Sequence, residues 1–249
     1  ILVQFHPDAN NHIVEVIESE GCEAVLPGLM WFVHNALTSG DYNWKTFGTE
    51  KWKRFLKKGF LAVLQQYQKP VDAALDTSQR FEVPTRISRI VEEAQQIVQL
   101  GNQSGEGWYL VGEMIDMIEE GVPNICVVQP FACLPNHVTG RGIFREIRRQ
   151  YPHANVASID YDPGASQVNQ LNRIKLMAAT ARDRHEELKN VEQGAPIRGE
   201  HVAGGGSATN GPGAASGTPG GDQDGSEHAG MAGAVDLKDA RGAVSLGVM

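Results

Sequence analysis

Among the side chains that could carry chemistry, the thiol of Cys133 has the most suggestive setting. It lies in residues 129–137, a polar and proline-rich loop that follows the apolar run 124–128. Thiolates that bind iron–sulfur clusters commonly lie in such loops, where backbone N–H groups donate hydrogen bonds to sulfur. A free cysteine is also often a small buried hydrophobe, and no Cys-x-x-Cys pair accompanies this one. Both a cluster ligand and a structural thiol are therefore compatible with this pattern.

Further candidate side chains lie in three polar loops: residues 101–107, residues 129–137, which contain Cys133, and residues 160–165. The first, residues 101–107, precedes an apolar helical pattern, so it could bind an anion at a helix N-terminus or simply form a tight strand-to-helix turn. It matches neither the dinucleotide-binding nor the P-loop pattern. In the third loop, residues 160–165, two aspartates could bind a cation, act as an acid–base pair, or stabilise the turn. The candidate binding residues are Asn102, Gln103, Gly105, Glu106, Gln129, Asn136, His137, Asp160 and Asp162; no catalytic base can be assigned.

Alternating apolar patterns predict the elements that position these loops. Strands are expected at residues 1–5, 23–26, 97–100, 124–128 and 155–159, and helices at 11–20, 108–120, 140–150 and from Ser166 onward. Strands that alternate with helices indicate an α/β fold, a doubly wound and mostly parallel sheet. Because ligands bind beyond the carboxyl ends of such strands, the three loops are expected to converge on one edge of the sheet.

The composition divides the chain into four segments. Residues 1–28 and 97–190 are expected to form the α/β domain, and residues 29–96 a helical insertion. The aromatic residues of this insertion recur at helical spacing, which favours a helix-packing core over a ligand platform; its short basic run, residues 51–58, is interpreted as a solvated helix face. Residues 191–249 are rich in glycine and lack an apolar period, so a disordered tail is expected.

Charge and cysteine content restrict the partners and the compartment. The formal net charge is −8 and the pI is near 5.5, which disfavours nucleic acid as a partner because phosphate backbones are bound by basic surfaces. No apolar run is long enough for a membrane span, and a secretory signal is not predicted. Three cysteines do not form a disulfide framework, so a reducing cytoplasm is expected. The absence of an initial Met suggests a piece of a longer protein.

Three segments resemble one group of proteins closely. They are GNQSGEGW (101–108), QPFACLPNHV (129–138) and IDYDPGASQVNQLNRIK (159–175), and the opening FHPDANN (5–11) is similar to the same group. The group comprises large proteins described as acyl-CoA dehydratase activases or 2-hydroxyglutaryl-CoA dehydratase-related proteins. The resemblance spans roughly residues 1–180, in order, and places the chain at the C-terminal end of that architecture.

The resemblance implies ATP-driven electron transfer at low potential in an anaerobic system, which permits elimination of water from a 2-hydroxyacyl-CoA, a lyase reaction. Cys133 matches the family's loop cysteine and would bind an iron–sulfur cluster, expected to be 4Fe-4S, with the other ligands supplied by other domains or a second chain. Cys126 departs from the pattern, because the family's strand cysteine is expected where Val127 stands. Cys22 stands where a small residue is usual.

The expected partners are the upstream activase and cluster domains, acyl-CoA and a second copy of the chain, and the chain is expected to be inactive alone. The alternative function is a non-catalytic scaffold or acyl-CoA-binding module of the same large protein. A flavodoxin-like domain that binds a nucleotide or a flavin is a third alternative, from fold analogy alone.

Overall fold

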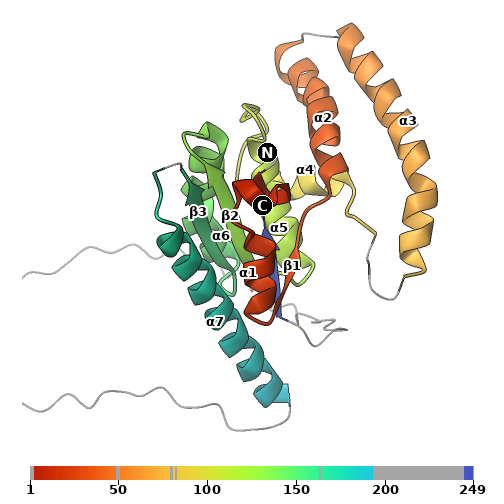
Figure 1. Cartoon of the computed structure of the whole chain (residues 1–249). Coiled ribbons are helices and arrows are strands. Elements are labelled where there is room, and N and C mark those ends of the chain that lie inside the picture. Colours follow the sequence, from red (N-terminus) through yellow and green to blue (C-terminus); the bar gives the residue numbers. More distant parts are fainter. Residues whose placement is uncertain are drawn as a thin grey trace, which may run out of the picture.

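The computed structural model describes residues 3–48, 51–78, 81, 83–162, 164–192 and 244–248. It is a mixed α/β structure in which helices predominate and surround a small parallel sheet (Figure 1). The predicted α/β class and the parallel pairing are confirmed. Among the described residues, no helix is long and apolar enough to cross a membrane.

The sheet has the strand order β1-β4-β2-β3, and every neighbouring pair is parallel. The strands are β1 (Cys22–Val25), β2 (Asn124–Pro130), β3 (Asn155–Tyr161) and β4 (Val244–Val248). In β2, the first six residues are all buried. This burial explains why its sequence is a continuous apolar run rather than an alternating one, as is typical of a strand covered on both faces.

Helices cover both faces of β2. On one face, α1 (Ile13–Ser19) and α7 (Gln167–Glu192) contribute Ile17 and Ile174 to a core that includes Cys126 and Val128. On the other face, α5 (Trp108–Glu119) and α6 (Phe144–Gln150) pack over Ile125, Val127 and Val156. Neighbouring residues of a strand point to opposite faces of the sheet. Alternate residues of β2 therefore pack against the two different layers of helices.

Two predicted strands are wrong, and so is part of the predicted tail. Residues 3–5 form a 3-10 turn, Val3–Phe5, and residues 97–100 form turns after α4 (Ile87–Gln95). The position beside β2 is taken instead by β4, whose Leu246–Val248 pair with Asn124–Cys126. The expected disorder over 191–249 is therefore wrong for 244–248, and α7 extends to Glu192. Residues 193–243, as well as Ile1 and Leu2 of the first predicted strand, lie outside the described residues.

Short 3-10 and π turns complete the described secondary structure. The 3-10 turn Pro7–Ala9 follows the first one, and a π turn over Asn136–Gly140 leads through a 3-10 turn, Arg141–Ile143, into α6. The helix predicted over residues 140–150 therefore begins as two irregular turns and becomes α-helical only at Phe144.

The predicted helical segment contains α2 (Leu29–Phe47), α3 (Lys51–Asp76) and α4. Helices α2 and α3 form a hairpin that projects from the sheet and its covering helices (Figure 1). Their contact includes ion pairs from Asp41 to Arg54, at 2.6 Å, and to Lys58, at 3.1 Å. The prediction that the aromatic residues of this segment form a core is wrong for α3, because Trp52, Phe55, Phe60 and Tyr67 are exposed.

Helices α4 and α5 pack so closely that glycine is required at their contact. A Cβ atom added to Gly112 of α5 would lie 2.5 Å from the carbonyl oxygen of Ile90 and 3.3 Å from the Cβ of Ala94, both in α4. We expect Gly112→Ala to destabilise the fold by about 1–3 kcal/mol, because α4 has to move outward. Urea denaturation measures this change.

The exposed glycine Gly59 in α3 provides the matched control, because nothing lies within 4 Å of its added Cβ. We expect Gly59→Ala to stabilise the chain by up to about 1 kcal/mol through helix propensity. Equal effects of the two substitutions would contradict the close packing of α4 on α5.

Candidate functional site

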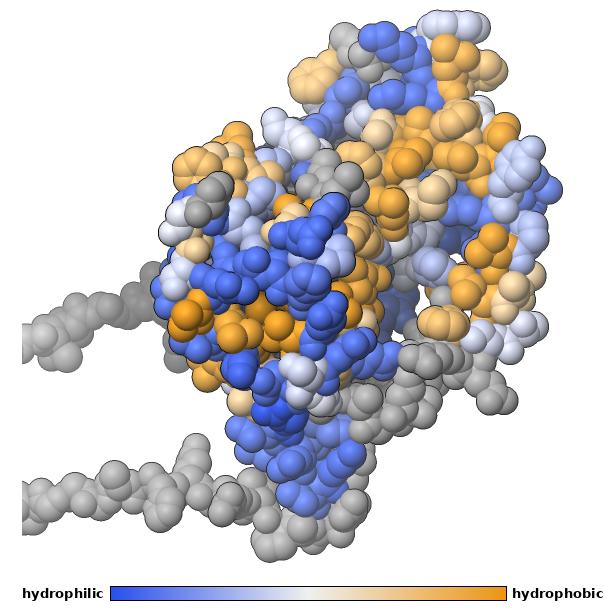
Figure 2. Space-filling view, viewed as in Figure 1, coloured by the Kyte–Doolittle hydropathy of each residue, from blue (hydrophilic) through white to orange (hydrophobic). Residues whose placement is uncertain are grey.

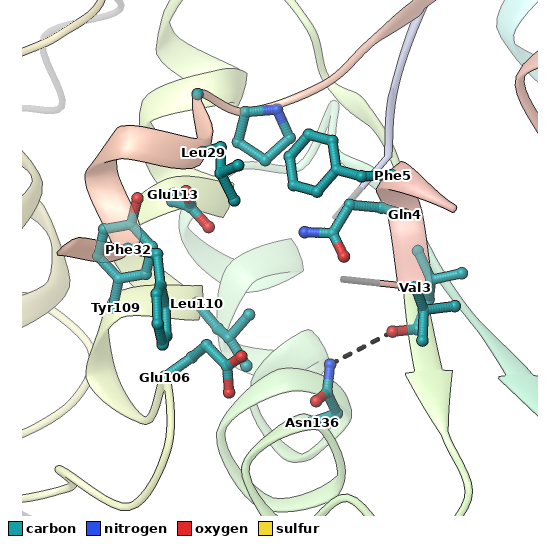
Figure 3. Close-up of a pocket in the computed structure, with 13 residues that line it drawn as sticks. Val3, Gln4, Phe5, Leu29, Phe32, Glu106, Tyr109, Leu110, Glu113 and Asn136 are labelled. Atoms are coloured by element: carbon teal, nitrogen blue, oxygen red, sulfur yellow. Dashed lines mark hydrogen bonds between the residues drawn. The ribbon is translucent and has the colours of Figure 1, made fainter. Parts of the chain in front are cut away.

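A small hollow lies at the carboxyl ends of β1 and β2. It is lined by the N-terminal turn, by the segment that joins β1 to α2, by the start of α5, and by Val128 and Asn136. Figure 3 shows Glu106, Tyr109 and Glu113 on one side of the hollow and Val3, Gln4 and Phe5 on the other. Water molecules can occupy about 30 Å³ of it, which is room for about two. The hollow lies where an open parallel sheet is expected to bind ligands.

Two side chains of α5 give this hollow its chemistry. Burial raises the pKa of Glu113 to about 8; the nearby hydroxyl of Tyr109 opposes this rise, and the charges of Asp116 and Glu106 add to it. Burial also raises the pKa of Tyr109, and the charge of Glu113 adds to that effect. The Tyr109 hydroxyl lies close enough to the Glu113 carboxyl for the contact to affect the pKa of both groups, and among the described residues it makes no hydrogen bond of standard geometry. At neutral pH both groups are therefore protonated and able to donate hydrogen bonds.

Apolar side chains surround these donors. Leu29 and Phe32 of α2, Leu110 of α5, and Val3 and Phe5 of the N-terminal turn complete the lining with Val128 of β2. Such walls lower the local dielectric, which makes an unpaired donor costly and a correctly placed acceptor valuable. The arrangement is therefore suited to a neutral acceptor such as a carbonyl oxygen.

The first two predicted loops meet at this hollow. Glu106 from the first loop and Asn136 from the second both line it. A Cβ added to Gly105 would lie 2.7 Å from Cγ of Pro135, so the two loops are in direct contact there. Asn102 and Gln103 of the first loop do not contribute to the lining. The backbone N–H of Trp108 donates to the Asn102 carbonyl at 2.8 Å, and that of Tyr109 to the Glu106 carbonyl at 2.8 Å.

The two backbone hydrogen bonds at the start of α5 argue against the anion site that the sequence offered as one alternative. They satisfy two N–H groups at the start of α5 within the loop itself, and Glu106 brings a carboxyl group to the same place. The Asn102 side chain donates to the Gln99 carbonyl at 3.0 Å, while Nε2 of Gln103 is buried without a partner among the described residues. The geometry thus favours the tight turn that the sequence left as an alternative.

The second loop is held by a chain of hydrogen bonds around Asn136. Buried Gln129 donates from Nε2 to the Asn136 carbonyl at 2.8 Å, and the Cys133 thiol donates to Asn136 Oδ1 at 2.7 Å. Asn136 Nδ2 donates to the Val128 carbonyl at 3.4 Å, the bond drawn in Figure 3. Nδ1 of the exposed His137 lies 2.8 Å from the Cys133 carbonyl. Gln129, Cys133 and His137 therefore position Asn136, which is the member of this loop that reaches the hollow.

The third predicted loop does not reach the hollow. Asp162 Oδ1 accepts a hydrogen bond from the Gly164 N–H at 3.0 Å, and its carbonyl accepts one from Ala165 at 2.8 Å. The carbonyl of Asp160 accepts from Nε2 of Gln170 in α7 at 2.7 Å. Both aspartates thus stabilise the turn into α7, the alternative that the sequence left open. Convergence of all three loops is confirmed for two of them only.

The three thiols, which the predicted cluster site would use, lie in different surroundings. Cys133 is partly exposed, whereas Cys126 and Cys22 are buried in strands. Burial raises the pKa of Cys126 to about 12, and its sulfur lies 3.2 Å from Sδ of Met177 on the α7 side of the sheet. Within the described ranges, no three His, Cys, Asp or Glu residues lie close enough to hold a metal ion together. These residues do not fit a complete cluster site, and Cys133 supplies one thiol at most.

Sequence reasoning missed Tyr109 and Glu113. Both lie inside the helix predicted over residues 108–120, in which Val111, Met114, Ile115 and Ile118 share one face. One sequence signal could have found the pair: Tyr109 and Glu113 are four positions apart, so their side chains lie on the same side of a helix. The chain matches no protein-family model, no curated protein and no solved structure.

Proposed function

We propose that this chain is a binding lobe of an acyl-CoA dehydratase activase-related protein, a doubly wound domain that holds the acyl carbonyl of a CoA thioester. The observation that carries the proposal is the pair of protonated donors, Glu113 and Tyr109, in an apolar hollow at the carboxyl edge of the sheet. The family resemblance of residues 101–108, 129–138 and 159–175 supplies the ligand class.

The size and polarity of the hollow restrict how the ligand binds. With room for about two waters, the hollow can take a carbonyl group and its neighbouring carbon, while the CoA moiety stays outside. A carboxylate is disfavoured, because Glu106 brings an acidic group to a lining that is otherwise largely apolar and an unpaired charge is costly there. The chain alone would then bind and orient a thioester, and the reaction would require the upstream domains.

Titration calorimetry with acetyl-CoA tests this proposal. We expect saturable binding at pH 7 that weakens about tenfold or more by pH 9.5, because ionisation of Glu113 removes a donor and adds a repelling charge. Glu113→Gln keeps an N–H donor and should retain its affinity at pH 9.5, whereas Tyr109→Phe should lose about 2–10-fold at pH 7. Asp162→Asn, in the turn away from the hollow, serves as the control. Absence of saturable binding, or the same pH dependence in Glu113→Gln, would contradict the proposal.

A second candidate is the cluster-bearing electron-transfer lobe that the resemblance implies. One observation favours it: Cys133 is partly exposed, whereas the other two thiols are buried, and it lies in a loop fixed beside the hollow. The remaining ligands would have to come from outside the described residues. We expect no stoichiometric iron or acid-labile sulfide after anaerobic reconstitution of the chain alone. Iron that is bound stoichiometrically and lost in Cys133→Ser would instead support the cluster-bearing lobe.

A further inference from the structure

Helix α3 carries an exposed apolar surface that the proposed function does not use. Every residue of this 26-residue helix is exposed or half-buried; α3 contacts α2, and its half-buried residues include Leu61, Leu64 and Leu75. On another side, six apolar residues are between half and four-fifths exposed; we call them the α3 stripe: Trp52, Leu56, Phe60, Val63, Tyr67 and Val71. Figure 2 shows apolar side chains gathered over α2 and α3. Exposed patches of this size mark interaction sites.

The spacing of the α3 stripe is the same in both directions. Its residues are 4, 4, 3, 4 and 4 positions apart, and the first three recur as the last three after 11 residues. A repeat of 11 corresponds to 3.67 residues per turn, close to the 3.6 of an α-helix, so the stripe runs almost straight along the helix. A pattern that reads identically from either end fits an antiparallel copy of itself.

From this symmetry we propose that the α3 stripe is the interface of a homodimer in which α3 packs antiparallel against α3 of a second copy. In that register Trp52 faces Val71 of the second copy, Leu56 faces Tyr67, and Phe60 faces Val63. Every pair joins a bulky aromatic residue to a smaller aliphatic one, which is how facing layers of a packed interface interdigitate. Such an interface is isologous and closes with two copies.

The exposed area of the stripe is comparable to that of a small specific interface. The aromatic residues of the stripe, Trp52, Phe60 and Tyr67, are 53–78% exposed. With the aliphatic residues of the stripe they present roughly 600–700 Å² of surface, since each aromatic side chain can bury about 150–250 Å². Specific interfaces bury about 600–1,000 Å² per partner, so the stripe corresponds to the lower end of this range.

The charges of α3 argue against an anionic partner for this surface. Of the basic run, Arg54 and Lys58 pair with Asp41, and Lys57 donates to Ser39 Oγ at 3.0 Å, all in α2. Lys51 lies over the ring of Trp44 at 5.7 Å. These contacts hold the named cations against α2. The stripe itself consists of uncharged residues.

Sedimentation velocity of the full chain at several concentrations tests the dimer. We expect a dimer that becomes monomeric in Phe60→Glu, with unchanged helix content by circular dichroism. Leu176→Glu in α7 is the control, because Leu176 is also an exposed apolar residue, at 70% against 53% for Phe60, but lies off the stripe. A wild-type chain that stays monomeric up to about 100 µM, or a dimer that persists in Phe60→Glu, would overturn the proposal.

A size exchange tests the register itself. Phe60→Val and Val63→Phe should each weaken dimerisation about tenfold or more, because one leaves a cavity and the other overpacks. The double variant Phe60→Val/Val63→Phe should return to within about threefold of the wild type, since it exchanges the two sizes within each facing pair. Failure of the double variant to recover would overturn the antiparallel register. A monomer that co-sediments with vesicles of anionic phospholipid would assign the stripe to a membrane surface instead.

Discussion

Replacing Glu113 with glutamine should stabilise the folded chain at pH 8 by about 2–4 kcal/mol relative to the wild type. Burial raises the pKa of Glu113 from 4.5 to about 8 in the folded chain. Between these values the folded chain holds a proton that the unfolded chain releases, so wild-type stability falls as pH rises from about 5 to 8. Glutamine is neutral at every pH and removes this contribution.

Urea unfolding at pH 5, 6.5 and 8 measures the effect. Glu93 and Asp116, whose pKa values burial raises to about 7 and about 6, act in the same direction, so Glu113→Gln should reduce the pH slope without abolishing it. The control is Glu146→Gln. The hydrogen bond from Arg149 lowers the pKa of Glu146 to about 2, so the contribution of Glu146 to stability is nearly constant from pH 5 to 8 and is lost only at lower pH. The same slope in the wild type and in Glu113→Gln would show that the carboxyl of Glu113 is not desolvated as described.

The sequence predicted the elements whose patterns are local. The apolar run of β2 and the stretch that forms α5 each carry their own periodicity and end signal, and Gly121 with φ +87° ends the second of them. The edge of the sheet at which the hollow lies also followed from the alternation of strands and helices, because ligand sites in such sheets lie beyond the carboxyl ends of strands.

The sequence could not predict features that depend on distant partners. Strand β4 has only five residues, and it lies between β1 and β2, with both of which it pairs. No local pattern distinguishes Val244–Val248 from the apolar run 97–100, which turns instead after α4. The hollow likewise depends on Tyr109 and Glu113, whose polar atoms become a site only when the N-terminal turn and α2 cover them. Tertiary context therefore overrides propensity at these places.

Gly107 fixes the entry into α5, and we expect Gly107→Ala to cost about 3–5 kcal/mol in unfolding free energy. Its φ of +45° and ψ of −118° lie in a region that side chains rarely adopt. A Cβ at this position would lie 1.8 Å from the carbonyl oxygen of Asn102. That oxygen accepts the Trp108 N–H at 2.8 Å, so relief of the clash breaks the bond that starts the helix.

The matched control for this prediction is Gly21→Ala. Gly21 also has a positive φ, +78°, but nothing lies within 4 Å of its added Cβ, so alanine there should cost about 1–2 kcal/mol from the backbone conformation alone. The difference between the two variants in urea denaturation isolates the clash with Asn102. Because Tyr109 follows Gly107 by two residues, Gly107→Ala should also weaken acetyl-CoA binding, whereas Gly21→Ala should not. Equal destabilisation by both substitutions would mean that the loop before α5 can relax, and the first loop would then not be the rigid wall that the proposed site requires.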